Sequence, residues 1–147
     1  MSFFQLEGAM TFVDELNRPL PGGTVLKDPC TLHEGIVAYM RFTGQQVMIH
    51  KSPNIGRPAI TPPSDFSVGK CKLVRTRAPE SAAEGEAIVL RAWSEVQRGT
   101  PWTVFDNCED FVSRAYTGQS GSVTRNFVLA LLTIAGACAL AAGASRS

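Results

Sequence analysis

The stretch WTVFDNCEDFVSRAYTG, residues 102–118, decides how the chain is organised. Asp106 and Asn107 are residue types that cap helix N-termini, and the pattern after them predicts a helix from near Cys108 to Gly118. A helix start stabilises negative charge, and a thiol reacts as a nucleophile in its thiolate form. Cys108 is therefore a candidate nucleophile.

A second helix is predicted upstream, between Pro-Glu-Ser at 79–81 and Gly-Thr-Pro at 99–101. Acidic residues in its first turns, among them Glu84 and Glu86, complement the positive end of a helix dipole. Glycine followed closely by proline is typical of a helix end. The two predicted helices therefore follow each other directly in the chain.

Apolar, partly β-branched runs predict strands at residues 24–26, 35–40, 46–50 and 67–75. The second and third of these form a predicted β-hairpin. Residues 52–67 contain Pro53, Pro58, Pro62 and Pro63, so we expect a surface loop there. The pattern predicts one α+β domain over residues 20–120, in which an antiparallel sheet of about four strands packs against the helix carrying Cys108.

The only two histidines flank the predicted hairpin. His33 comes just before its first strand and His50 ends its second, so a hairpin brings both to one edge of the sheet. An imidazole near Cys108 would act as its base. One cysteine and two histidines also fit many proteins, in which a buried cysteine is a packing residue and a histidine is structural.

The sequence NCEDFV at residues 107–112 closely resembles the NCEHF signature of the lecithin:retinol acyltransferase-like family, within the circularly permuted NlpC/P60 papain-like superfamily. PGGTV at 21–25 looks like the family's opening strand. PCTLHEGIV at 29–37 and VMIHKSP at 47–53 look like its two histidine segments. The resemblance covers roughly residues 20–118, with the motifs in the family's order.

Carried over by position, the resemblance implies that Cys108 is the nucleophile, His33 the general base and His50 the residue that orients His33. The two histidines could exchange roles. The amide of Cys108, with Asn107 beside it, is the expected donor to a developing oxyanion. The implied chemistry proceeds through an acyl-cysteine intermediate and needs neither a metal nor another cofactor.

The sequence departs from the family pattern in its charges. Asp110 replaces the histidine of the signature, and Glu34 replaces an aromatic residue after the first histidine. Glu34, Glu109 and Asp110 are therefore candidates for the substrate edge of the site. Glu34 is expected either to be a solvated charge or to select a cationic or polar substrate.

Composition narrows the other possibilities. A net charge of +1 and a pI near 7.7 give no general reason to expect nucleic-acid binding. The N-terminus does not resemble a secretory signal, so we expect an intracellular, reducing setting without disulfides. Cys71 and Cys138 are then expected to be packing residues, while Cys30 is a weaker rival to Cys108 because no predicted helix begins there.

The C-terminal stretch FVLALLTIAGACALAAGA, residues 127–144, contains no charged residue. Its length is the minimum for crossing a bilayer as a helix, so we expect a membrane tail, the alternative being a buried core helix. A tail would place the site at a lipid surface, which favours phospholipid or other lipid acyl groups as substrate. The alternatives are a peptide or cell-wall amidase and a catalytically inactive module recruited to membranes.

Overall fold

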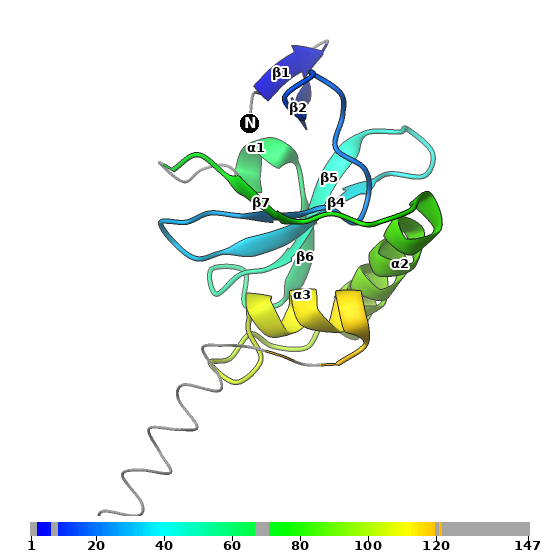
Figure 1. Ribbon diagram of the computed structural model, residues 1–147. Coiled ribbons are helices and arrows are strands. Elements are labelled where there is room, and N and C mark those ends of the chain that lie inside the picture. The colour runs from blue at the N-terminus through cyan, green and yellow to red at the C-terminus, as the bar shows by residue number, and fades with distance from the viewer. Residues whose placement is uncertain (1–2, 7–8, 67–70, 120, 122–147) are drawn as a thin grey trace, which may run out of the picture.

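The computed structural model describes residues 3–6, 9–66, 71–119 and 121, and it is an α+β domain built on a five-stranded antiparallel sheet (Figure 1). The strand order is β6-β5-β4-β3-β7, with a separate β1-β2 hairpin. The strands are β1 (Phe3–Leu6), β2 (Ala9–Phe12), β3 (Val25–Lys27), β4 (Glu34–Tyr39), β5 (Gln46–Lys51), β6 (Pro58–Thr61) and β7 (Val74–Arg77). The helices are α1 (Pro63–Phe66), α2 (Ala82–Arg98) and α3 (Cys108–Thr117).

The sheet is covered on both faces. Successive residues of a strand point to opposite sides of the sheet, so a single strand contributes to the packing on both. In β5, Val47 and Ile49 pack in a cluster with residues of α2 and α3. Met48 packs on the other face with Phe66 of α1 and Phe12 of β2. Figure 1 accordingly shows α1 and the β1-β2 hairpin on one side of the sheet and α3 on the other.

Both predicted helices are confirmed, and their ends are set by capping. The hydroxyl of Ser81 accepts a hydrogen bond from the Glu84 amide at the start of α2. Asn107 caps α3 in the same way, accepting from the amides of Glu109 and Asp110. Each helix ends at a glycine in the left-handed region, with φ 63° and 77° respectively.

The predicted loop at 52–67 is wrong in part, because it contains β6 and α1. Pro58 is tolerated since β6 lies at the edge of the sheet, where a missing N–H breaks no internal ladder. Pro63 begins α1, where a helix leaves its first N–H groups unpaired in any case. The sheet therefore has five strands rather than about four.

The packed domain also extends upstream of Leu20, where the sequence placed its start. Phe12 is fully buried, and its backbone is paired by a side chain of β5. The Gln46 amide oxygen accepts from the Phe12 N–H at 2.6 Å, and its nitrogen donates to the Phe12 carbonyl at 3.3 Å. This pairing ties residues before Leu20 to the central sheet.

The expectation of free thiols is wrong for two cysteines: Cys30 and Cys71 form a disulfide, with their Cα atoms 6.0 Å apart. The pairing of two strands distant in the sequence brings these cysteines together. Strand β3 pairs with β7 so that Lys27 lies opposite Val74, which brings the chain just after β3 beside the chain just before β7. Neither cysteine is then the packing residue or rival nucleophile that the sequence predicted.

The predicted tail at 127–144, with Cys138, lies outside the described residues. Among the helices that the structure describes, none is long and apolar enough to cross a bilayer.

Candidate active site

The two histidines meet at one end of the β4–β5 hairpin, as the sequence predicted. His50 lies opposite Gly35, two residues after His33. Nε2 of His33 lies 2.8 Å from Nδ1 of His50, and Nε2 of His50 lies 3.0 Å from the hydroxyl oxygen of Thr61. Three side chains from adjacent segments thus form one hydrogen-bonded row.

Thr61 was missed by the sequence analysis, because its segment was expected to be an irregular loop. In the structure it ends β6, where Ala59 pairs with His50. Residues two apart on a strand share a face, so Thr61 is a diagonal neighbour of His50. The only local signal for this contact was a β-branched residue beside the prolines.

The row allows one proton arrangement that leaves a base available. If Nε2–H of His33 donates to Nδ1 of His50, then Nε2–H of His50 donates to Thr61. Nδ1 of His33 then carries the free lone pair. In this arrangement both rings are neutral, and His33 is ready to accept a proton.

Phe66 of α1 packs against both imidazoles. Its ring centroid lies 5.2 Å from that of His33 and 5.3 Å from that of His50. This packing requires Gly35, because a Cβ at that position would lie 2.7 Å from the Phe66 ring. A glycine on β4 therefore makes room for the side chain that holds the histidine pair.

Cys108 is the first residue of α3, and its sulfur lies 4.0 Å from the carbonyl oxygen of Leu32. Leu32 itself has φ 58°, a conformation that costs about 1–2 kcal/mol for a side-chain-bearing residue. The residue before His33 is therefore held in an unusual conformation, with its carbonyl toward the cysteine.

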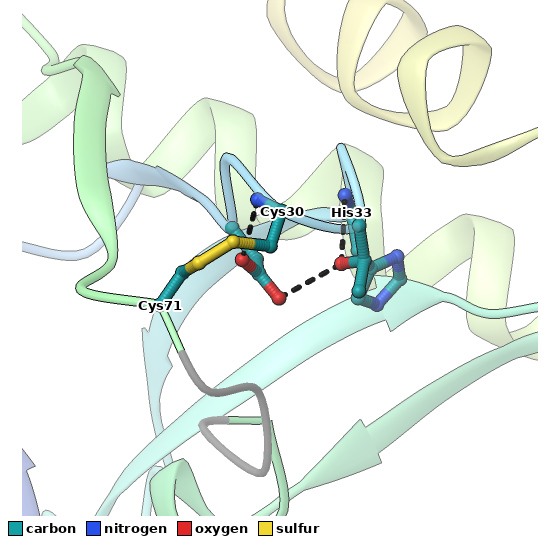
Figure 2. Close-up of a disulfide and its surroundings, with 5 residues drawn as sticks. Cys30, His33 and Cys71 are labelled. Carbon is teal, nitrogen blue, oxygen red and sulfur yellow. Dashed lines mark hydrogen bonds between the residues drawn. A yellow bond between two sulfur atoms is a disulfide. The ribbon is translucent and has the colours of Figure 1, made fainter.

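The turn that carries His33 is tied down on its other side by the disulfide (Figure 2). The Asp28 carboxylate accepts hydrogen bonds from the Cys30 amide at 2.9 Å and from the Thr31 hydroxyl at 2.8 Å. The amide of Asp28 donates to the His33 carbonyl at 2.8 Å. The structure thus fixes both ends of this short turn.

Cys108, His33 and His50 line one cleft of about 610 Å³. Ile55 and Phe66 contribute apolar side chains to its wall, which is otherwise lined mostly by polar residues. The cleft therefore brings together the three residues predicted to be catalytic and could hold an apolar group beside them.

Both imidazoles are neutral at neutral pH. Burial lowers the pKa of His33, although the nearby Asp28 carboxylate partly opposes this shift. Burial, together with the charge of a protonated His33, lowers the pKa of His50 to about 4. A neutral imidazole is the form that can accept a proton from a thiol.

Cys108 is a thiol at rest, which corrects the expectation of a thiolate at the helix start. Burial raises the pKa of Cys108, and the charges of Glu34 and Glu109 raise it further. Backbone hydrogen bonds from the same two residues oppose the shift without overcoming it. The sulfur must therefore lose its proton during attack.

The acidic residues predicted at the substrate edge occupy different places. Glu34 and Glu109 share Lys27, whose ammonium lies 3.2 and 3.9 Å from their carboxylates. Asp110 is fully buried. None of the three lines the cleft, although Glu34 and Glu109 act on the sulfur through their charge.

Asn107 does not extend into the cleft either, because its side-chain oxygen caps α3 and its nitrogen donates to the Val104 carbonyl at 3.3 Å. The amide of Cys108 remains the candidate oxyanion donor, since a first helical residue has no acceptor within its own helix.

One group of potential metal ligands occurs in the described part of the chain. Oxygen and sulfur atoms of Asp28, Cys30 and Cys71 lie within 4.8 Å of one another. The two sulfurs are joined in the disulfide, so the group presents no thiolate to a metal ion.

Comparisons with models of protein families, with curated proteins and with solved structures found no match.

Proposed function

We propose that this protein is a cysteine-dependent acyl hydrolase or acyltransferase with the permuted papain-like arrangement of the lecithin:retinol acyltransferase-like family. One observation carries the proposal. The row of His33, His50 and Thr61 borders the same cleft as a free cysteine at a helix start. This is the combination of nucleophile, base and orienting group that thiol acyl transfer requires.

The reaction begins when the Cys108 sulfur attacks an acyl carbonyl while Nδ1 of His33 takes the thiol proton. The Cys108 amide stabilises the oxyanion of the tetrahedral intermediate. The intermediate collapses, the leaving oxygen or nitrogen receives the proton from His33, and the acyl group stays on sulfur. Water or an acceptor, deprotonated by His33, then attacks the thioester and releases the thiol.

Lipid acyl groups are the proposed substrates. The cleft wall contains apolar side chains, and Val104 and Phe105, just before the nucleophile, are 44 % and 50 % exposed. Such residues suit contact with an acyl chain. The apolar sequence at 127–144 would keep the domain at a lipid surface.

Release of fatty acid from phosphatidylcholine vesicles by the full chain tests this proposal. We expect Cys108→Ala to abolish release and Cys138→Ala, the matched change of another thiol, to leave it intact. Peptide amides are assayed in parallel. If the protein cleaves peptide amides but releases no fatty acid from lipid esters, peptides rather than lipids are its substrates. Equal activity of Cys108→Ala and the wild type would rule out the proposed enzyme.

A further inference from the structure

Lys51, the residue after His50, is a lysine with a fully buried side chain. Its ammonium lies 2.8 Å from Oδ2 of Asp106, and no aligned hydrogen bond to a described residue satisfies it. Burying an ammonium costs several kcal/mol, even after relaxation of its surroundings. A fully buried ammonium paired with a carboxylate that is still 29 % exposed is therefore a weak source of stability, and its position suggests another use.

The pair joins the two halves of the proposed site. Lys51 ends β5, directly after the histidine that orients the base. Asp106 lies two residues before Cys108, in a turn closed by hydrogen bonds with Thr103. One ion pair therefore connects the strand that carries His50 to the segment that delivers the nucleophile.

Asp106 has a second partner, but that partner belongs to the helices. Its Oδ1 lies 2.8 Å from Nη2 of Arg114 on α3, and Arg114 lies 2.9 Å from Glu95 on α2. Arg114 therefore connects Asp106 to α2 and α3, whereas Lys51 connects it to the sheet. Without Lys51, this network would not tie the start of α3 to β5.

We infer that Lys51 is a positioning residue, whose ion pair with Asp106 holds the Cys108 sulfur in register with the histidine row. This inference rests on the proposed function. Consecutive strand residues point to opposite faces, so His50 reaches the cleft while Lys51 reaches the helix layer from the same piece of backbone. A shift at Asp106 would move α3 relative to His33, and displacements of about 1 Å can cost roughly 100-fold in rate.

A double-mutant cycle on the alkylation of Cys108 by iodoacetamide tests the inference without a substrate. The rate at Cys108 is followed by mass spectrometry in the full chain. In the wild type, His33→Ala should slow alkylation by roughly 100-fold, the lower end of general-base effects. In a Lys51→Met background the same change should have less than about a threefold effect, because the inferred register between the base and the sulfur is lost.

In a Lys51→Arg background, His33→Ala should again slow the alkylation of Cys108 nearly as much as in the wild type. Arginine keeps the positive charge opposite Asp106. Lys72→Met is the matched control, because it makes the same change at an exposed lysine. A full His33 effect in Lys51→Met would overturn the inference while leaving the proposed function intact. No His33 effect in the wild type would overturn both.

A second variant distinguishes loss of the positioning ion pair from unfolding of the domain. Asp106→Asn keeps the size of the side chain and removes its charge, so it should also reduce the His33 effect. Thermal melting establishes that each variant is folded under the assay conditions. If Asp106→Asn is folded and retains the full His33 effect, the ion pair does not position the sulfur.

Discussion

Nε2 of His33 lies 2.8 Å from Nδ1 of His50, and Nε2 of His50 is hydrogen-bonded to the hydroxyl of Thr61. In the proton arrangement that leaves Nδ1 of His33 free, the Thr61 hydroxyl accepts the Nε2–H of His50, although Thr61 is two side chains away from that nitrogen. This relay connects an edge strand to the base of the proposed reaction.

Thr61→Val should reduce kcat for ester hydrolysis by roughly 10-fold with little change in KM. The substitution keeps the shape of the side chain and leaves a buried N–H of His50 without its acceptor, a loss worth about 1–3 kcal/mol. Thr61→Ser keeps the hydroxyl and should stay close to the wild type. Equal kcat values for the valine and serine variants would contradict the relay.

Acid should destabilise the protein through His50. The pKa of His50 falls from 6.5 to about 4 on folding, so the unfolded chain binds a proton that the folded chain does not bind. The free energy of unfolding should therefore decrease as the pH falls from about 6.5 to about 4, by up to about 3 kcal/mol. Urea titrations across this range measure the slope.

His50→Asn should flatten that part of the stability curve, since asparagine does not titrate. An unchanged slope in this variant would assign the acid sensitivity to other groups. Asp106 is not such a group in this pH range. Although burial alone would raise its pKa, contacts with Lys51 and Arg114 hold the pKa below its ordinary value. Its contribution is therefore lost only below about pH 3.8, as the pH falls through the lowered pKa.

Glu109→Gln should make Cys108 more reactive. The change removes one of the two carboxylate charges that raise the pKa of the thiol, so more thiolate forms near neutral pH. The gain should not exceed about fivefold, because partly exposed charges interact with energies of about 1 kcal/mol or less. Alkylation rates compared with Glu86→Gln, the same change at an exposed position on α2, measure the effect. A slower reaction in Glu109→Gln would contradict this electrostatic picture.

Removing the disulfide should destabilise the domain and disturb the histidine turn. Cys30 and Cys71 are 41 positions apart, and closing a loop of that length stabilises a fold by about 4 kcal/mol in the chain-entropy account. The double serine variant should lose stability of this order in urea titrations. It should also lose more ester hydrolysis than Cys138→Ser, because the bridge anchors the turn that carries His33. Full activity in the double variant would separate the bridge from the site.

Local chemistry made much of the fold and the site predictable. Asn107 and Gly118 are residues with strong capping preferences, so they marked the ends of α3 and the place of Cys108. The hairpin between the two histidines followed from apolar runs of ordinary length. A hairpin brings its outer ends together, which is why His33 and His50 could be placed side by side.

The remaining features depend on contacts between distant segments. Pro58 and Pro63 are compatible with a loop, an edge strand or a helix start, and only the neighbouring β5 decides between these. Cys30 meets Cys71 because β3 pairs with β7. The raised pKa of Cys108 arises from burial and from two carboxylates near the sulfur. The position of Cys108 at a helix start, taken alone, therefore predicted a pKa shift in the wrong direction.

Intact-protein mass spectrometry of the full chain, after mixing with the p-nitrophenyl ester of a short fatty acid, tests directly whether Cys108 forms an acyl-enzyme. We expect a mass increase of one acyl group, mapped by peptide analysis to Cys108 and absent from both Cys108→Ala and His33→Ala. Acylation at another residue, or undiminished acylation of Cys108 in His33→Ala, would rule out Cys108 as a nucleophile activated by His33.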